Sequence, residues 1–162
     1  MKKLTFCILM FLFILPFSGC KEKVPEKINM HIDNHYIASV AVLELEGLII
    51  YTEDAQMYLD MSTPDELSGL SFSFDDDFTI GYRGLNAQTE TDYLPQSSFA
   101  QSIKNTLNDA LLTNPPLEKV SDKKYTATGK THSGVYKIFT DEFGNIKEIE
   151  VSGMSVKLKV EN

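Results

Sequence analysis

The stretch LSFSFDDDFTIGY, residues 70–82, carries the pattern from which the fold of this chain can be inferred. Apolar and polar residues alternate over 70–74 and again over 78–82, and three consecutive aspartates separate the two runs. Because successive side chains of a strand point to opposite faces, each run predicts a strand with one apolar face and one polar face. The charged stretch between them is typical of a turn. We therefore predict an antiparallel hairpin that packs its apolar face on a core.

Alternation and β-branched residues predict further strands on both sides of this hairpin, about eight in all. In chain order the expected strands cover residues 35–46, 48–51, 56–61, 70–74, 78–82, a short stretch at 125–127 where Tyr125 and Ala127 alternate, 135–140, 147–151 and 156–160. Gly47 is expected to end the first of them. After the hairpin, the polar composition of residues 86–91 predicts a loop.

Between the two groups of strands the hydrophobic period changes from two residues to four. The apolar residues that recur at this spacing are Phe99, Ile103, Leu107 and Leu111. Polar residues fill the other side, so the segment predicts one amphipathic helix of about four turns. Ser97 or Ser98 can cap its start, and the NPP sequence at 114–116 stops it.

This order of elements predicts an α+β domain. A sheet with one apolar face must cover that face, and the amphipathic helix offers the matching surface. The economical arrangement is a single curled antiparallel sheet, an incomplete barrel, with the main amphipathic helix on its concave face.

The N-terminus has the layout of a cleavable export signal. Lys2 and Lys3 precede an apolar stretch over residues 4–17, and small Ser18 and Gly19 follow it. The apolar stretch is about 14 residues long, whereas a membrane-spanning helix needs about 20. We therefore predict a secretory signal rather than a transmembrane anchor.

The end of this signal, Phe17-Ser18-Gly19-Cys20, resembles the lipobox of bacterial lipoproteins. The resemblance implies cleavage before Cys20 and attachment of a diacylglycerol to its thiol. Phe17 stands where a lipobox usually has an aliphatic residue. An ordinary secretory signal with an incidental cysteine is the alternative. Two acyl chains give stable membrane anchoring, whereas one holds a protein only marginally.

Three regions follow from these patterns. Residues 1–19 are expected to be the lipoprotein signal peptide, residues 20–30 the lipidated N-terminus with a polar tether, and residues 31–162 a single β-rich domain. The expected location is the extracytoplasmic side of the cell membrane, reached through the lipid.

Charge and cysteine content exclude several classes of partner and site. The chain has a net charge of −8, and loss of Lys2 and Lys3 with the signal makes it about −10. Such a surface repels nucleic acids, so we expect no nucleic-acid partner. Cys7 lies within the signal, which leaves Cys20 as the single mature cysteine. A disulfide within the mature chain or a thiolate zinc site is therefore not expected.

The sequence contains no recognisable catalytic motif. Gly-x-Ser-x-Gly, His-Glu-x-x-His and Gly-rich phosphate loops are absent. His31 and His35 fit no zinc spacing, and we interpret them as parts of a solvated turn. The aspartates at 75–77 could offer oxygens to Ca²⁺, but a charged hairpin turn explains them. Glu44 and Glu46 could form a carboxylate pair, but a solvated strand face explains them equally. We expect no enzyme activity, no metal and no cofactor.

Six segments carry a resemblance to a known family: residues 47–51, 57–59, 64–70, 80–85, 94–95 and 134–151. Together they resemble small envelope lipoproteins of low-GC Gram-positive bacteria, whose folded part is similar to the lipoprotein-carrier (LolA-like) fold. The resemblance covers about residues 36–160. It implies an incomplete β-barrel closed by helix, with an apolar groove that can hold acyl chains. A soluble carrier is not itself lipidated, so the carrier role is not implied.

Two function classes remain. In the first, the protein is a non-enzymatic interaction or envelope-organising module, with the membrane and another envelope protein or a lipid as partners. In the alternative, it binds a lipid or other apolar ligand between sheet and helix, where a continuous cavity of about 300 Å³ or more would be expected. The candidate groove residues, which would equally serve as core, are Met57, Leu59, Met61, Phe72, Phe74, Ile80, Tyr82, Phe99, Ile103 and Leu107.

Overall fold

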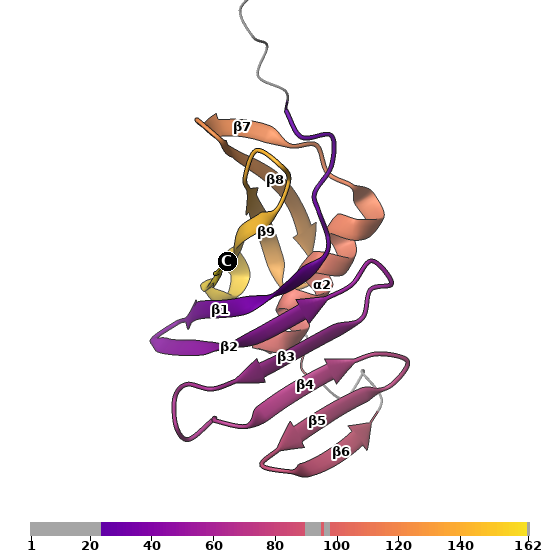
Figure 1. Cartoon of the computed structure of the whole chain (residues 1–162), viewed down its shortest axis with the longest axis vertical. Coiled ribbons are helices and arrows are strands. Elements are labelled where there is room, and N and C mark those ends of the chain that lie inside the picture. Colours follow the sequence, from indigo (N-terminus) through magenta and orange to yellow (C-terminus); the bar gives the residue numbers. More distant parts are fainter. Residues whose placement is uncertain (1–23, 90–94, 96–97, 162) are drawn as a thin grey trace, which may run out of the picture.

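A computed structural model describes residues 24–89, 95 and 98–161, which form an eleven-stranded sheet and an α-helix (Figure 1). The strands before the helix are β1 (Ile32–Val40), β2 (Leu43–Tyr51), β3 (Met57–Met61), β4 (Leu70–Phe74), β5 (Phe78–Tyr82) and β6 (Leu85–Thr89). The helix is α2 (Phe99–Thr113). It is followed by β7 (Glu118–Ser121), β8 (Lys124–Thr131), β9 (Gly134–Thr140), β10 (Ile146–Val151), the 3-10 helix η3 (Ser152–Met154) and β11 (Val156–Val160).

The strands pair in the order β6-β5-β4-β3-β2-β1-β11-β10-β9-β8-β7, and every pairing is antiparallel. The first and last strands of the chain meet at the centre of the sheet, where Tyr36 lies opposite Val160. Strands β6 and β7 form the two edges, so the sheet is not closed. The predicted α+β class, with an open antiparallel sheet and a helix, is confirmed.

The hairpin and the helix occur where the sequence predicts them. Phe74 lies opposite Phe78 and Leu70 opposite Tyr82, with the three aspartates in the turn. Ser98 caps the helix, since its side chain accepts a hydrogen bond from the backbone N–H of Gln101. Local pattern is sufficient for both elements because each forms from neighbouring residues.

One apolar face runs along the sheet and meets the helix. Because residues directly opposite in an antiparallel pair share a face, Ile49, Leu59 and Phe72 form one apolar row across β2, β3 and β4. The helix contacts β8 and β10 on the other half of the sheet. Figure 1 shows α2 running across one face of the sheet, between the part formed by β7–β9 and the part formed by β1–β6.

The predicted strand over residues 35–46 is wrong, because two strands share this segment. Strand β1 ends at Val40, and Ala41 and Val42 turn the chain into β2. Ala41 has a φ of 55°, a left-handed conformation that alanine rarely adopts, so its residue type gives no turn signal. Gly47 does not end a strand but lies inside β2, opposite Tyr36.

Two strands were not predicted at all. Residues 85–89, most of which were assigned to a polar loop, form β6, and residues 118–121 form β7. Both are edge strands, and almost all of their side chains are exposed. An edge strand that buries neither face needs no alternating apolar residues, and its pairing comes from backbone hydrogen bonds.

The folded part begins earlier in the chain than expected. Ile28 and Met30 belong to the stretch assigned to the tether, yet both side chains are buried in the core. Between them, Asn29 forms an isolated parallel bridge with Asn145. The polar residues around these two apolar anchors, Glu26, Lys27 and Asn29, are exposed, so the stretch looks like a tether in the sequence.

Candidate functional site

The helix presents its apolar stripe to the sheet. Phe99, Ile103 and Leu107 are buried, and each lies one turn after the previous one. The Phe99 ring lies 6.0 Å from the Tyr36 ring, centroid to centroid. The stripe therefore packs into the core, as its four-residue spacing predicts.

Two tyrosines tie the helix to opposite halves of the sheet. The Tyr51 hydroxyl on β2 donates to Asn108 Oδ1 at 2.9 Å. The Tyr136 hydroxyl on β9 donates to Asp109 Oδ2 at 2.7 Å. These neighbouring helix residues are held from β2 on one side and β9 on the other, so the bonds fix the rotation of α2.

A glycine makes room for the second of these tyrosines. Gly129 lies directly opposite Tyr136 on the neighbouring strand β8. A Cβ atom at this position would lie 2.2 Å from the Tyr136 hydroxyl oxygen. The absence of a side chain at Gly129 therefore lets the tyrosine ring cross β8 and reach the helix.

Burial sets the protonation of the groups between sheet and helix. It raises the pKa of Tyr51 to about 12. Burial, reinforced by the Asp109 carboxylate, also raises the pKa of Tyr136 well above its usual range, so both phenols remain donors at neutral pH.

A lysine on the same helix is also partly removed from water. Burial lowers the pKa of Lys104, and the nearby Asp75 carboxylate opposes this effect. Its ammonium donates to the backbone oxygen of Ala55. It also lies 5.9 Å from the centroid of the Tyr51 ring and 5.8 Å from that of the Phe74 ring. Lys104 thus contributes cation–π contacts and a hydrogen bond to the packing of α2 against the sheet.

The ten predicted groove residues differ in how deeply their side chains are buried. The buried side chains are Met57, Leu59, Met61, Phe74, Phe99, Ile103 and Leu107. Phe72 and Ile80 are half-buried, and Tyr82 is 38% exposed. Cover over this apolar face is therefore complete at the Phe74–Phe78 pair beside the β4–β5 turn, and it decreases along both strands toward Tyr82.

Two hollows lie near this region. One of about 140 Å³ is bordered by Met57 and Phe74, which is below the size of an ordinary ligand site. A larger one, about 450 Å³, lies at the C-terminal end of α2, where Ile28, Leu111 and Phe143 contribute to its wall. None of the ten predicted groove residues lines the larger hollow.

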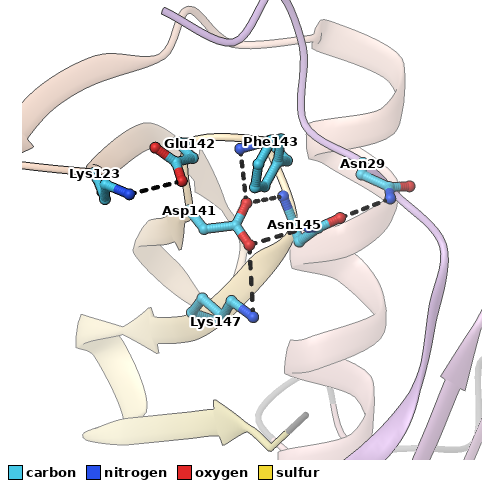
Figure 2. A network of polar contacts seen from close by, with 7 residues as sticks. All are labelled: Asn29, Lys123, Asp141, Glu142, Phe143, Asn145 and Lys147. Atoms are coloured by element: carbon cyan, nitrogen blue, oxygen red, sulfur yellow. Dashed lines mark hydrogen bonds and ion pairs between the residues drawn. The ribbon is translucent and has the colours of Figure 1, made fainter.

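A polar network organises the turn between β9 and β10, at residues 141–145 (Figure 2). Asp141 Oδ1 accepts from the backbone N–H groups of Phe143 at 2.9 Å and Asn145 at 3.0 Å. Its Oδ2 accepts from the Asn145 side chain at 3.0 Å and lies 3.6 Å from the Lys147 ammonium. One carboxylate therefore organises the whole turn and leaves Phe143 at its tip, 75% exposed.

The same turn holds the N-terminal segment (Figure 2). Asn29 Nδ2 donates to Asn145 Oδ1 at 2.9 Å, and the Asn29 backbone N–H donates to the Gly144 oxygen at 2.9 Å. Gly144 has a φ of +85°, and a Cβ there would lie 2.5 Å from the Lys27 oxygen. The segment that leads toward Cys20 is thus fixed against the β9–β10 turn.

The turn network also controls the titration of Asp141. Burial favours the neutral acid, but hydrogen bonds from Asn145 and the Phe143 backbone, together with Lys147, outweigh it and hold the pKa of Asp141 below its usual range. Sequence reasoning identified residues 141–145 as a turn but missed that it binds Asn29. An Asp that precedes a Gly by three residues is a signal for the turn itself, whereas nothing local indicates its partner.

The residues that the sequence offers for catalysis or metal binding do not form a site among the residues that the structure describes. In the described part of the chain, no three His, Cys, Asp or Glu residues are grouped closely enough to hold a metal ion. His31 and His35 are exposed, and His35 lies within β1 rather than in a turn. Glu44 and Glu46 are exposed on β2. Asp75 and Asp77 accept hydrogen bonds from glutamine side chains, those of Gln56 and Gln88.

The predicted lipidation site, Cys20, lies outside the described residues. Within residues 24–89, 95 and 98–161, no helix has the length and apolar character needed to cross a membrane.

Comparison with known proteins gives this chain no family. No protein-family model matches it, and no curated protein matches it in sequence.

Proposed function

We propose that this protein is a lipid-anchored, extracytoplasmic and non-enzymatic module that engages another component of the cell envelope. The observation that carries the proposal is the sequence Phe17-Ser18-Gly19-Cys20 at the end of a short apolar export signal. A diacylglycerol on Cys20 would supply the stable attachment that the acidic chain cannot obtain from basic residues.

The packing between sheet and helix supports an interaction role. Ile103 and Leu107 are fully buried against the sheet, and tyrosine hydrogen bonds hold the helix from both halves. A helix held in this way behaves as part of the core rather than as a movable lid. The outer surface of the module then carries its function.

We also propose that the fold is of the lipoprotein-carrier (LolA-like) type. The support is an open antiparallel sheet whose helix stands between the two edge strands in the chain, after β6 and before β7.

The anchoring part of the proposal is tested by Cys20→Ala. Cells that express the variant would be labelled with an alkyne-tagged palmitate and separated into membrane and soluble fractions. We expect loss of label, together with release from the membrane or retention of the uncleaved signal. Cys7→Ala is the matched control, because it removes a cysteine inside the signal and should leave label and fractionation unchanged. Normal processing and full membrane retention of Cys20→Ala would refute lipidation.

Binding of an apolar ligand is the second candidate, and the incomplete cover over part of the apolar face of β4 and β5 favours it. Phe72 and Ile80 lie opposite each other on the core-facing side yet are only half-buried. Lipid extracted from the protein purified out of membranes would be identified by mass spectrometry. We expect Ile80→Asn to reduce any bound lipid, and Val42→Asn, at a distant exposed turn, to retain it. An extract without bound lipid would rule this candidate out.

A further inference from the structure

Three separate segments meet at the end of the domain where the N-terminal segment leaves it. We define the anchored end as residues 24–29, 118–124 and 141–145. Lys123 and Glu142, 3.1 Å apart, join the β7–β8 turn to the β9–β10 turn. The Asn29–Asn145 hydrogen bond joins the N-terminal segment to the same β9–β10 turn. Figure 1 shows this segment, β7 and the loop after β9 together at the upper end of the molecule.

Each segment of the anchored end exposes an apolar side chain. Val24 is 43% exposed, Val120 is 54% exposed and Phe143 is 75% exposed. Phe143 is the largest of them, and the Asp141 network holds its backbone in place. An aromatic side chain on an organised turn is suited to enter an apolar phase, because little conformational freedom is lost there.

Charge is distributed unequally between this end and the rest of the domain. Residues 24–89 contain twelve acidic and two basic residues, whereas residues 98–161 contain eight acidic and nine basic residues. The anchored end itself contains five acidic and four basic residues. The acidic excess lies on strands β1–β6 and the loops that join them, and β3–β6 lie at the opposite end in Figure 1. An anionic membrane surface therefore repels the distal part more strongly than the anchored end.

Chain length places the anchored end near the bilayer. Cys20 precedes Val24 by four residues, which span at most about 14 Å when fully extended. The lipid on Cys20, which belongs to the proposed function, would hold Val24 within roughly that distance of the membrane surface. The Asn29 backbone N–H donates a hydrogen bond to the Gly144 oxygen. The turn that carries Phe143 therefore lies close to the membrane as well.

We propose that the anchored end rests on the outer surface of the bilayer that holds the Cys20 lipid, with the Phe143 ring inserted at the boundary between headgroups and acyl chains. This orientation rests on the proposed lipidation. It turns strands β3–β6 away from the membrane and presents their acidic surface to the space beyond it.

The sequence contains no tryptophan, so Phe143→Trp introduces a single tryptophan, whose emission can be excited apart from that of the tyrosines, at the proposed contact. Val42→Trp is the matched control, because Val42 is 96% exposed at the β1–β2 turn, outside the anchored end. Both lipidated full-length mature proteins would be reconstituted into phosphatidylethanolamine–phosphatidylglycerol vesicles with brominated acyl chains. We expect a blue-shifted emission and about twofold or stronger quenching for Phe143→Trp, and neither effect for Val42→Trp.

The experiment distinguishes failure of the proposed lipidation from failure of the proposed orientation. The mass of the N-terminal peptide and flotation of the protein with the vesicles report the anchor before fluorescence is measured. Anchored proteins with equal, water-like emission at both positions would overturn the orientation and leave the lipoprotein proposal intact. Absence of lipid on Cys20 would overturn both. Thermal unfolding midpoints equal to that of the unsubstituted protein show that both variants retain the fold.

Discussion

The Tyr136 hydroxyl donates a 2.7 Å hydrogen bond to the Asp109 carboxylate, and this bond joins β9 to α2. The two residues are 27 positions apart in the chain. The bond depends on Gly129, whose missing side chain leaves space for the tyrosine ring. This contact between helix and sheet thus depends on the relative positions of three elements, β8, β9 and α2.

Removal of this hydroxyl tests the contact. We expect Tyr136→Phe to lower the free energy of unfolding by about 1–3 kcal/mol, because Asp109 loses a donor at a partly buried site. Tyr58→Phe on the opposite face of β3 is the control and should change stability by less than about 0.5 kcal/mol. Chemical denaturation measures both. Equal effects of the two substitutions would contradict a structural role for the bond.

Two leucines on the same helix test whether its stripe is core. Leu107 is fully buried, whereas Leu112 is 84% exposed. We expect Leu107→Ala to destabilise the protein by about 2–5 kcal/mol through loss of packing and a residual cavity. Leu112→Ala should have almost no effect, since alanine has a good helix propensity and no contacts are lost. A decrease in the free energy of unfolding below about 1 kcal/mol for Leu107→Ala would indicate instead that the helix packs loosely on the sheet.

Two phenylalanines on β4 test how far the core extends along this strand. Phe74 is buried and packs at 4.8 Å from the Phe78 ring centroid, whereas Phe72 is half-buried. We expect Phe74→Ala to cost about 3–5 kcal/mol, and Phe72→Ala about half as much. Denaturation of the two variants in parallel gives the comparison. A larger loss for Phe72→Ala would show that the middle of β4 is better packed than its end at Phe74.

The turn network predicts a pH-dependent effect at Asp141. The folded-state pKa lies below the unfolded value of about 3.9, so the ionised carboxylate stabilises the fold above that pH. This contribution is lost as the pH falls through the folded pKa. We expect Asp141→Ala to cost about 2 kcal/mol at pH 7, with the difference from the unmodified protein shrinking below about pH 4. Glu142→Ala in the same turn is the control, and an unchanged difference between pH 7 and pH 3 would contradict the network.

The features that could be predicted are those encoded by neighbouring residues. The β4–β5 hairpin and α2 followed from alternation, a charged turn and a four-residue stripe. Edge strands β6 and β7 could not, because they bury neither face and so carry no apolar pattern. The turn at Ala41 was missed because the position adopts a left-handed conformation without a glycine or asparagine.

The candidate site was predicted less completely than the fold. The groove residues were chosen by strand and helix periodicity, and seven of the ten are buried. Periodicity indicates which face a side chain occupies, but it does not indicate how well another element covers that face. The anchored end was not predicted, because the bond between Asn29 and Asn145 joins residues 116 positions apart.

The sequence by itself determined the class of the fold, the hairpin and helix, the acidic charge and the prediction of a lipid on Cys20. Each of these depends on residues that are adjacent or regularly spaced, where side-chain direction and charge are fixed by local chemistry. Only the tertiary structure decided that β1 and β11 pair at the centre of the sheet and that Tyr51 and Tyr136 hold the helix from both sides. It alone placed Phe143 beside the N-terminal segment. These relationships require distant segments to meet, and chain closure over such separations is directed by the packing of the whole core rather than by any local pattern.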